Sequence, residues 1–339
     1  MNMNAVFLKS IALSTLLSLS VTCSTSSAAE DAKKEFRIGI IGLDTSHVLA
    51  FTKGINGDGD KPGIEGFRVV AAYPKGSPDI ETSVSRVPKY TEEMQARGIE
   101  IVDSIEDLLA KVDGVMLETN DGRPHLEQVR PVIAAGKPVF IDKPISGSLA
   151  EAIAIFTLAR KANVPMFSSS SLRFGKDSQA VRGGSIGKVS FCETSSPCTL
   201  EKTHPDLFWY GIHGCESLFT VMGTGCETVE RRTEDGKIVV EGTWAGNRTG
   251  IFREGKGYSG HAKGSEGEAA VGSYDGYLPL VEQILEFFTT GEPPVGEAET
   301  LEIYAFMEAA DESKRQGGKP VKIAEVMAKA EKEAAALTE

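Results

Sequence analysis

Six residues that follow an apolar segment have part of the pattern with which proteins bind a dinucleotide cofactor. Residues 42–47 read Gly-Leu-Asp-Thr-Ser-His, whereas the complete fingerprint is Gly-x-Gly-x-x-Gly. In that fingerprint the first glycine makes a tight turn, the second lets the backbone approach the pyrophosphate, and the third lets the helix pack on the strand. Only Gly42 is present here. The turn is therefore a weak indication of a dinucleotide site, and an ordinary strand-to-helix turn explains it equally well.

The replaced positions work against a bound pyrophosphate. Asp44 stands at the second position, where its carboxylate is expected to repel anionic phosphates at contact distance. His47 stands at the third position, and its bulk is expected to push the helix away from the strand. The next predicted strand ends without an acidic residue for a ribose hydroxyl, and Lys75 and Ser77 could instead meet a 2′-phosphate.

Histidines and carboxylates form a second set of candidates. His213 and Glu216 are spaced i, i+3, so a helix would place both on one face. They could donate two ligands to a divalent metal, with Asp44, His47 or His204 completing the shell. A hydrogen-bonded structural pair is the commoner reason for such a spacing, so the metal site is only an alternative.

Other aromatic and charged residues also allow two interpretations. The run 208–210, Phe-Trp-Tyr, could stack on a sugar ring or pack in the core. Arg173 could contact an acidic or hydroxylated substrate, or form an interdomain salt bridge. Glu118 and Asp206 could each act as a general base, or serve as a strand-end acceptor or a helix cap.

Apolar strands alternate with helical patterns in the first half of the chain, which predicts βα units around a parallel sheet. Ser104 and Ser148 each stand three residues before an acidic residue, the spacing of a helix N-cap, and Gly136 is expected to end a helix. The stretch 54–66 is typical of a surface insertion. The predicted strands of this half are 36–41, 67–73, 115–119, 138–142 and 164–169.

Strand-like segments prevail after residue 187 and predict a mostly antiparallel sheet. Helices are expected at 208–222, 277–289 and 298–316, and the glycine-rich stretch 255–267 is expected to be a mobile loop or a hairpin tip. The fold class is therefore α/β, with a Rossmann-like doubly wound parallel sheet and a C-terminal α+β domain whose sheet is open and mostly antiparallel. The predicted strands of this half are 188–193, 228–232, 237–244, 248–253 and 269–274.

The first 29 residues have the features of a signal peptide. Lys9 precedes the apolar run 11–21, which is too short for a lasting membrane span, and a zone of small residues ends at Ala29. Cleavage there would export the chain, and we expect a periplasmic protein; a lipid anchor on Cys23 is the minor alternative. An oxidising compartment permits disulfides, and the sequence leaves three pairings or free thiols open for Cys192, Cys198, Cys215 and Cys226.

The net charge disfavours one class of partner. The 339 residues carry a formal charge of −12 with a pI near 5.1, so a polyanion such as nucleic acid is a poor partner. The chain after the signal peptide is long enough for two domains with their own cores. We expect a Rossmann-like domain at 35–175, an α+β substrate and oligomerisation domain at 176–325, and a helical tail at 326–339.

Several segments resemble the glucose-fructose oxidoreductase / inositol dehydrogenase (Gfo/Idh/MocA) family. That family has a strand with a downstream histidine, then Ala-Gly-Lys-x-Val and a Glu-Lys-Pro signature. Residues 112–125 and 134–144 are similar to this pattern, with Asp142, Lys143 and Pro144 as the signature. Further matches, within a resemblance that spans 36–323, are 184–187 (Gly-Ser-Ile-Gly), 211–213 (Gly-Ile-His) and 309–313.

The resemblance implies an NAD(P)-dependent oxidoreductase that acts on a hydroxyl of a sugar or polyol. In such enzymes the signature lysine lies between nicotinamide and substrate, and the histidine that opens the later helix helps to move the hydroxyl proton, which implies catalytic roles for Lys143 and His213. A hydride leaves a carbinol carbon only if the hydroxyl proton is taken. The family's aspartate four residues before that histidine is Trp209 here. Candidate contacts of the cofactor, NAD or NADP, are Gly42, Asp44, Thr45, Ser46, Thr119, Asn120, His125, Asp142 and Lys143, and candidate substrate contacts are Arg173, Trp209, Tyr210 and Glu216.

The competing prediction is an exported homologue that has lost the dinucleotide and binds or cleaves carbohydrate, with or without a divalent metal. Export of an unfolded chain without a cytosolic cofactor favours it, as do Asp44 and His47. Under either prediction the partner is a small sugar or polyol, no lasting membrane span forms, and the outer face of the second sheet could support a homo-oligomer.

Overall fold

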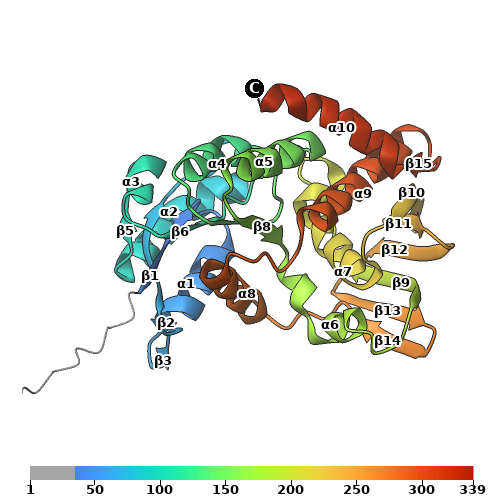
Figure 1. Cartoon of the computed structure of the whole chain (residues 1–339), viewed down its shortest axis with the longest axis horizontal. Coiled ribbons are helices and arrows are strands. Elements are labelled where there is room, and N and C mark those ends of the chain that lie inside the picture. The colour runs from blue at the N-terminus through green and yellow to red at the C-terminus, as the bar shows by residue number, and fades with distance from the viewer. Residues whose placement is uncertain (1–34, 339) are drawn as a thin grey trace, which may run out of the picture. The chain divides into compact units, whose positions relative to one another are not determined.

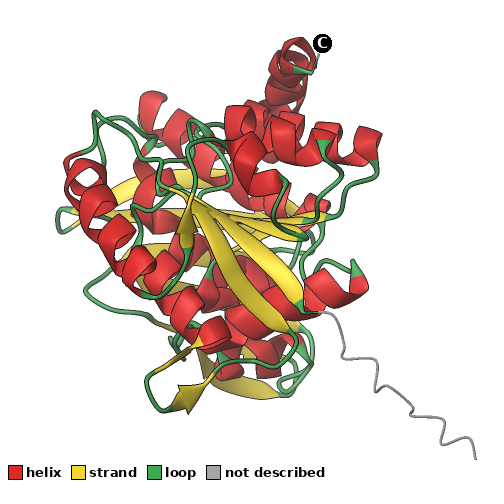
Figure 2. Cartoon of the chain, turned by 90° about the vertical axis from the view of Figure 1, so that its left-hand side faces the viewer, coloured by secondary structure: helices red, strands yellow, loops and turns green. Residues whose placement is uncertain are grey.

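The computed structural model describes residues 35–338, and the predicted signal peptide lies outside them. The described residues form two large sheets with helices packed on them (Figure 1, Figure 2). The first sheet is entirely parallel, in the order β5-β4-β1-β6-β7-β8. The order of its strands reverses between β1 and β6, and open α/β sheets bind ligands at such a point. Its strands are β1 (Phe36–Ile41), β4 (Phe67–Tyr73), β5 (Glu100–Ile101), β6 (Gly114–Leu117), β7 (Val139–Asp142) and β8 (Met166–Ser169).

Two hydrophobic clusters lie on opposite faces of this sheet. One cluster joins the sheet to α3, α4 and α5, and the other joins it to α1, α2 and α8. Helix α8 follows six of the seven strands of the second sheet in the chain and returns to the first sheet, beside α1 (Figure 1). The elements that complete this part are α1 (Ser46–Asn56), β2 (Gly57–Asp58), β3 (Lys61–Pro62), α2 (Glu81–Ala96), α3 (Ile105–Leu109), α4 (His125–Ala134), α5 (Leu149–Ala162), η1 (Ser171–Phe174), α6 (Lys176–Arg182) and α8 (Leu278–Thr290).

The second sheet has the order β14-β13-β9-β12-β11-β10-β15 and is antiparallel except for the β9–β12 pair. The expected loop at 255–267 is wrong in part, because its middle pairs with β9 and β14 as β13. Helices α7 and α9 pack on this sheet (Figure 1). The elements are β9 (Val189–Ser196), η2 (Leu207–Gly211), α7 (Ile212–Met222), β10 (Cys226–Glu234), β11 (Lys237–Trp244), β12 (Arg248–Glu254), β13 (Ser259–Gly264), β14 (Gly267–Val271), α9 (Glu297–Arg315), β15 (Val321–Lys322) and α10 (Ile323–Leu337).

The predicted α/β class is confirmed, and so are the local signals that begin and end its helices. The hydroxyls of Ser104 and Ser148 accept hydrogen bonds from the backbone nitrogens of Asp107 and Glu151. Gly136 follows α4 with a φ of 66°. These caps satisfy backbone groups that helix ends leave without partners.

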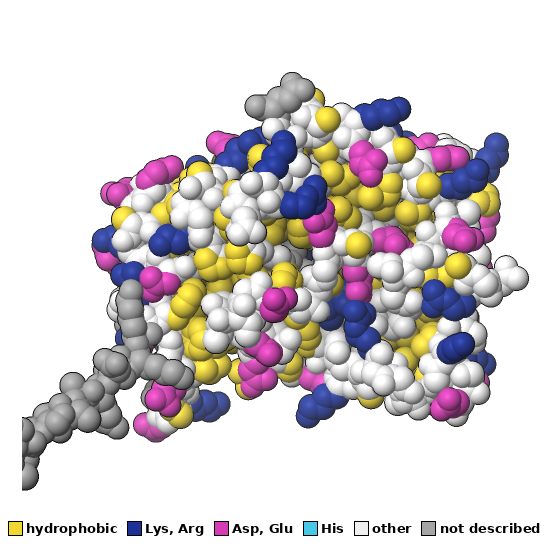
Figure 3. Space-filling model, viewed as in Figure 1, with side chains coloured by type: hydrophobic (Ala, Val, Ile, Leu, Met, Phe, Trp, Pro, Cys, Tyr) yellow, Lys and Arg dark blue, Asp and Glu magenta, His cyan; other side chains and the backbone are white. Residues whose placement is uncertain are grey.

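The described residues also show the state of the cysteines and the character of the surface. The four cysteines there are buried free thiols, and burial raises the pKa of each. Acidic, basic and apolar side chains are interspersed on the face that Figure 3 shows. Within residues 35–338, no helix has the length and apolar character that crossing a membrane requires.

Gly42 makes the turn that leads from β1 into α1. Its φ is 93°, in the region that favours glycine, and a Cβ at this position would lie 2.4 Å from the backbone nitrogen of Thr119. The turn therefore needs glycine both for its backbone conformation and for the close approach of the chain after β6. This approach sets the start of α1 beside the end of β6.

Replacement of Gly42 by alanine is expected to lower the free energy of unfolding by about 3 kcal/mol or more, because backbone strain and a clash act together. Gly136→Ala is the matched control, since Gly136 also has a positive φ but has open space where a Cβ would lie. Its loss is expected to be about 1 kcal/mol. Urea unfolding of both variants measures the difference, and equal losses would contradict a tight approach at Gly42.

Candidate functional site

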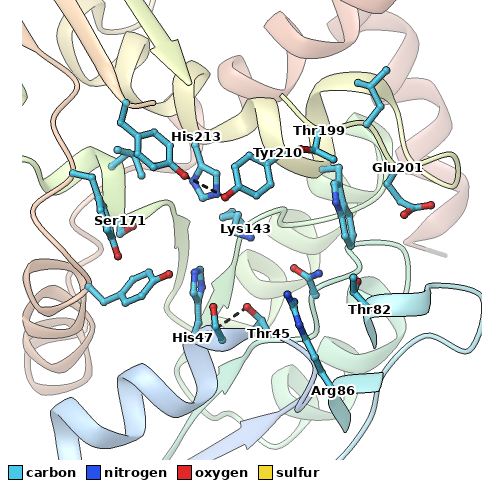
Figure 4. A pocket seen from close by; sticks show the side chains of 18 residues that line it. Thr45, His47, Thr82, Arg86, Lys143, Ser171, Thr199, Glu201, Tyr210 and His213 are labelled. Atoms are coloured by element: carbon cyan, nitrogen blue, oxygen red, sulfur yellow. Dashed lines mark hydrogen bonds between the residues drawn. The ribbon is translucent and has the colours of Figure 1, made fainter. Parts of the chain in front are cut away.

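A cavity of about 500 Å³ lies at the carboxyl edge of the first sheet (Figure 4). Thr45, Asn120, Lys143 and Ser171 line it, and they follow the ends of β1, β6, β7 and β8. The opposite wall comes from the start of α7 and from the segments that precede β13 and α8. Segments from both halves of the chain thus enclose one space, at the point where the strand order reverses.

Lys143 and His213 both line this cavity (Figure 4). Lys143 is only 6% exposed, and its ammonium has no hydrogen-bond or ion-pair partner among the residues that the structure describes. The hydroxyl oxygen of Ser170 lies 2.7 Å from Nδ1 of His213. Burial, with the positive charge of Lys143 and that of His47 when its ring is protonated, holds the pKa of His213 well below its ordinary value. The two predicted catalytic residues therefore meet, and the imidazole of His213 is neutral at neutral pH; their roles remain predictions.

His47 does not push α1 away from β1, so that expectation is wrong. Its ring points towards β7, where Nδ1 lies 2.6 Å from Oδ2 of Asp142. Phe51 stacks on the ring, and Tyr277 meets it edge-on. The helix remains in the core, because Val48 and Phe51 are fully buried. His47 is thus held between the helix and the sheet edge, and it lines the cavity.

Asp44 has a different place from the predicted one, because its carboxylate lies between loops and does not line the cavity. Oδ1 accepts a hydrogen bond from the backbone nitrogen of Asn120 (2.8 Å), and Oδ2 accepts one from the hydroxyl of Ser83 (2.7 Å). Burial raises the pKa of Asp44 in spite of these bonds. The carboxylate therefore links the turn after β1 to α2 and to the loop after β6.

Further hydrogen bonds join the loops that follow β1, β4 and β6. The backbone nitrogen of Leu43 donates to the carbonyl of Lys75 (3.1 Å), and the hydroxyl of Ser77 donates to Asp121 (2.6 Å). Ser77 is buried in this contact, so its predicted availability for a 2′-phosphate is wrong. Rossmann proteins hold the ribose of the adenosine half at the end of the second strand. Here these bonded loops occupy that place, and none of residues 73–79 lines the cavity.

The residues present fit one end of a nicotinamide dinucleotide and not the other. Thr45 and Ser46, at the start of α1, place backbone N–H groups where phosphate oxygens are favoured, and Arg86 and Asn120 lie beside them. Lys143 lies between His213 and His47 in the same cavity (Figure 4). At the place of the adenosine end, the hydrogen bonds of Asp44 and Ser77 instead join the loops that follow β1, β4 and β6.

Three predicted cofactor contacts lie behind the cavity wall. His125 is fully buried, with Nε2 2.8 Å from the carbonyl of Thr119 and Nδ1 3.2 Å from that of Ile145. It ties the loop after β6 to the loop after β7. Asp142 is buried under His47, and the hydroxyl of Thr119 donates to Gln128. These residues position the loops of the site without facing its space.

Two predicted substrate contacts are also placed elsewhere. Arg173 is 1% exposed, and its guanidinium pairs with Glu216 and with Glu299 (2.7 Å). The salt-bridge interpretation of Arg173 is therefore the correct one, and Glu216 is its partner. Glu118 is fully buried at the end of β6. Asp206 lies 2.6 Å from the cationic groups of both Arg231 and Lys314, and it does not line the cavity.

The predicted metal shell is not assembled. Within residues 35–338, no group of three or more histidine, cysteine or acidic side chains could hold a metal ion. Glu216 accepts a hydrogen bond from Ser169 (2.8 Å), whereas His213 faces Ser170, so the two side chains do not converge. His204 instead contacts Asp121, at 3.0 Å.

Aromatic side chains form much of the outer wall. Trp209 and Tyr210 line the cavity as predicted, whereas Phe208 is buried in the core. Ten further lining residues were not predicted, and four of them have large aromatic or cationic side chains. No motif or spacing marks these four, because they stand in helix α2 and in the loops before β13 and α8. They are Arg86, Tyr258, Tyr274 and Tyr277.

Asp121 joins the loops around the cavity through a buried network. Its side chain accepts hydrogen bonds from Ser77 and Arg123 and lies against His204. Burial raises its pKa, but the bonds from His204, Arg123 and Ser77 outweigh burial and leave the pKa of Asp121 far below its ordinary value.

Acid is therefore expected to weaken the fold through Asp121. A carboxyl whose pKa is depressed on folding stabilises the protein above its unfolded value, about 3.9, and that stabilisation is lost as pH falls further. Asp121→Asn should lose stability at neutral pH and show a flatter decline below about pH 4. Thermal melting between neutral and acid pH measures this, with Asp60→Asn, an exposed acid, as the control. Parallel curves for wild type and Asp121→Asn would contradict it.

The first sheet and its helices match a known protein family, and the whole fold matches solved structures. Residues 36–169 match the model of the Gfo/Idh/MocA oxidoreductase family, NAD-binding Rossmann fold. Structures with the same fold include a putative myo-inositol dehydrogenase from Sinorhizobium meliloti (TM-score 0.67, 17% identity, covering 85% of this chain and 99% of that one). A scyllo-inositol dehydrogenase from Lactobacillus casei with bound NAD(H) and scyllo-inositol is also similar (TM-score 0.67, 14% identity, 86% and 100%). No curated protein matches in sequence. Residues 36–169 thus match the Rossmann fold of the Gfo/Idh/MocA oxidoreductase family, and the solved structures with the same fold cover most of the chain.

Proposed function

We propose that the chain is an NAD(P)-dependent oxidoreductase that acts on a hydroxyl group of a sugar or polyol. The observation that carries this proposal is the meeting of Lys143 and His213 in one cavity at the switch point of a Rossmann sheet. A nicotinamide beside Lys143 would accept the hydride from the carbinol carbon. The protein must then handle the hydroxyl proton and the charge that develops on oxygen.

The side chains of the cavity suit this task. The ammonium of Lys143 is buried without a partner, so it can stabilise negative charge on a substrate oxygen. The neutral imidazole of His213 can exchange a hydrogen bond or a proton with a hydroxyl. Trp209 and Tyr210 offer faces for the C–H side of a sugar ring and polar groups for its hydroxyls. The inositol dehydrogenase with bound NAD(H) and scyllo-inositol has the same fold, which supports this substrate class.

We also propose that the protein is exported to the periplasm after cleavage of residues 1–29, and that copies associate through the second sheet. The sequence of the first 29 residues supports export. The seven-stranded open sheet offers a broad face for association.

A second candidate function is an exported, cofactor-free protein that binds or cleaves carbohydrate. The observation that favours it is the joining of the loops at the place of the adenosine end, where Asp44 bonds to Asn120 and Ser83 and where Ser77 bonds to Asp121. The cavity with Lys143 would still hold a polyhydroxylated ligand under this candidate.

Calorimetry with NAD, NADP and ADP-ribose, followed by assays with myo-inositol and scyllo-inositol, separates the two candidates. The first candidate predicts binding of NAD or NADP and formation of reduced nicotinamide in the presence of a polyol substrate. Binding of a polyol without binding of either dinucleotide would contradict it and favour the second candidate.

The joined loops at the adenosine end predict a gain of cofactor affinity on mutation. Asp44→Gly restores the second glycine of the fingerprint and removes both hydrogen bonds of the carboxylate, so ADP-ribose is expected to bind at least about tenfold more tightly. Asp60→Gly makes the same change at an exposed turn and should leave the affinity unchanged. Calorimetry measures both variants, and equal affinity of wild type and Asp44→Gly would show that Asp44 does not obstruct the site.

A further inference from the structure

His47 and Asp142 form a pair that the family resemblance does not assign. The ring of His47 lines the cavity, and its Nδ1 lies 2.6 Å from Oδ2 of Asp142, which is buried beneath it. Phe51 and Tyr277 contact the ring with centroid distances of 5.2 and 4.7 Å. The ring is therefore clamped in one orientation by a carboxylate and by two aromatic neighbours.

This contact determines which nitrogen carries the proton of a neutral imidazole. Nδ1 faces a carboxylate, which accepts hydrogen bonds and does not donate them. The Nδ1–H tautomer is therefore favoured, as in other histidines that a carboxylate orients. The lone pair is then on Nε2, which has no hydrogen-bond partner among the described residues.

A second buried carboxyl group, that of Glu118, affects the net charge behind His47. Glu118 is fully buried, and neither of its oxygens has a hydrogen-bond partner in the described part of the chain. Burial and the charge of Asp142 raise the pKa of Glu118 well above its ordinary value, which favours the neutral acid over the carboxylate. Burial also raises the pKa of Asp142, but His47 and Lys143 outweigh burial and leave it lowered. One negative charge therefore lies behind His47, where it would stabilise an imidazolium.

We propose that His47, oriented by Asp142, is the base that takes the hydroxyl proton of the substrate in this cavity. The inference rests on the proposed function, because it requires a hydroxylated ligand beside Lys143. The O–H bond of the ligand breaks, an N–H bond forms at Nε2 of His47, and the electron pair stays on the oxygen as an alkoxide. The ammonium of Lys143, in the same cavity, stabilises that alkoxide.

The other groups near His47 are consistent with His47 as the base and Lys143 as the group that stabilises the alkoxide. Besides Asp142 and Lys143, the titratable groups that face it are His213 on α7 and Tyr277 before α8. His213 is turned to the hydroxyl of Ser170 through Nδ1, and no carboxylate between residues 35 and 338 pairs with it. Of the two cavity histidines, only His47 is thus coupled to a buried anion, which is what a histidine needs to hold an added proton.

Nitrogen NMR of the histidine rings tests the pair without a known substrate. The chain has five histidines, so His47→Gln identifies the signals of His47. At the pH of the assays we expect a protonated Nδ1 and an unprotonated Nε2. In Asp142→Asn the amide can donate a hydrogen bond to Nδ1, so the proton is expected to move to Nε2. A protonated Nε2 in the wild-type protein would overturn the proposal, because that nitrogen could not accept a proton.

Kinetics with a polyol found in the inositol assays tests the catalytic role. His47→Gln and Asp142→Asn should each lower kcat about 100-fold or more with a small change in KM, and the pH dependence of kcat in the acid limb should disappear. His261→Gln is the matched control, since His261 on β13 pairs with Glu268 on β14 and both side chains are about half exposed to solvent. Wild-type kcat and pH profile in a folded His47→Gln protein would overturn the proposal. If no polyol reacts, the result counts against the proposed function. The NMR experiment alone would then test whether Asp142 orients His47 with a free Nε2.

Discussion

The contact between His47 and Asp142 is the interaction on which the site depends. It joins the first turn of α1 to the end of β7, across the point where the strand order of the parallel sheet reverses. A glycine at position 47 would let helix and strand approach but would contribute no functional group. A histidine keeps the helix in place through its aromatic contacts and brings a polar ring to the cavity. At the third position of the fingerprint, His47 therefore provides an imidazole that a glycine would not.

The same turn explains why the site has two unequal ends. Asp44 is drawn away from the cavity by Asn120 and Ser83, and its hydrogen bonds join the turn after β1 to α2 and to the loop after β6. The neighbouring position, Thr45, remains open to the cavity at the start of α1. Two replacements three residues apart therefore act differently: Asp44 joins the surrounding loops, and His47 lines the cavity.

Much of the fold followed from the sequence because its signals are local. Alternating strands and helices, the serine caps and the helix-ending Gly136 depend on residues close together in the chain, and the structure has them as expected. The signature Lys143 and the later His213 were brought together by resemblance, and the structure places both on one cavity. The strand at 259–264 was missed because its glycine-rich sequence has no strand pattern. Its hydrogen bonds come from β9 and β14, and the local sequence does not indicate them.

The partners of polar side chains were harder to predict, because they come from elements far apart in the sequence. The bond between His47 and Asp142 spans 95 positions, and that between Arg173 and Glu299 spans 126. Nothing in the local pattern around Arg173 distinguishes a substrate contact from a buried salt bridge. The three tyrosines before β13 and α8 were missed for the same reason.

A crystal structure of the protein with a bound polyol such as scyllo-inositol would test the central claim most directly. We expect one hydroxyl oxygen within hydrogen-bond distance of both Nε2 of His47 and Nζ of Lys143, with the ring of the polyol against Trp209 or Tyr210. A polyol bound outside this cavity, or a His47 ring turned away from Asp142 in the complex, would contradict the claim.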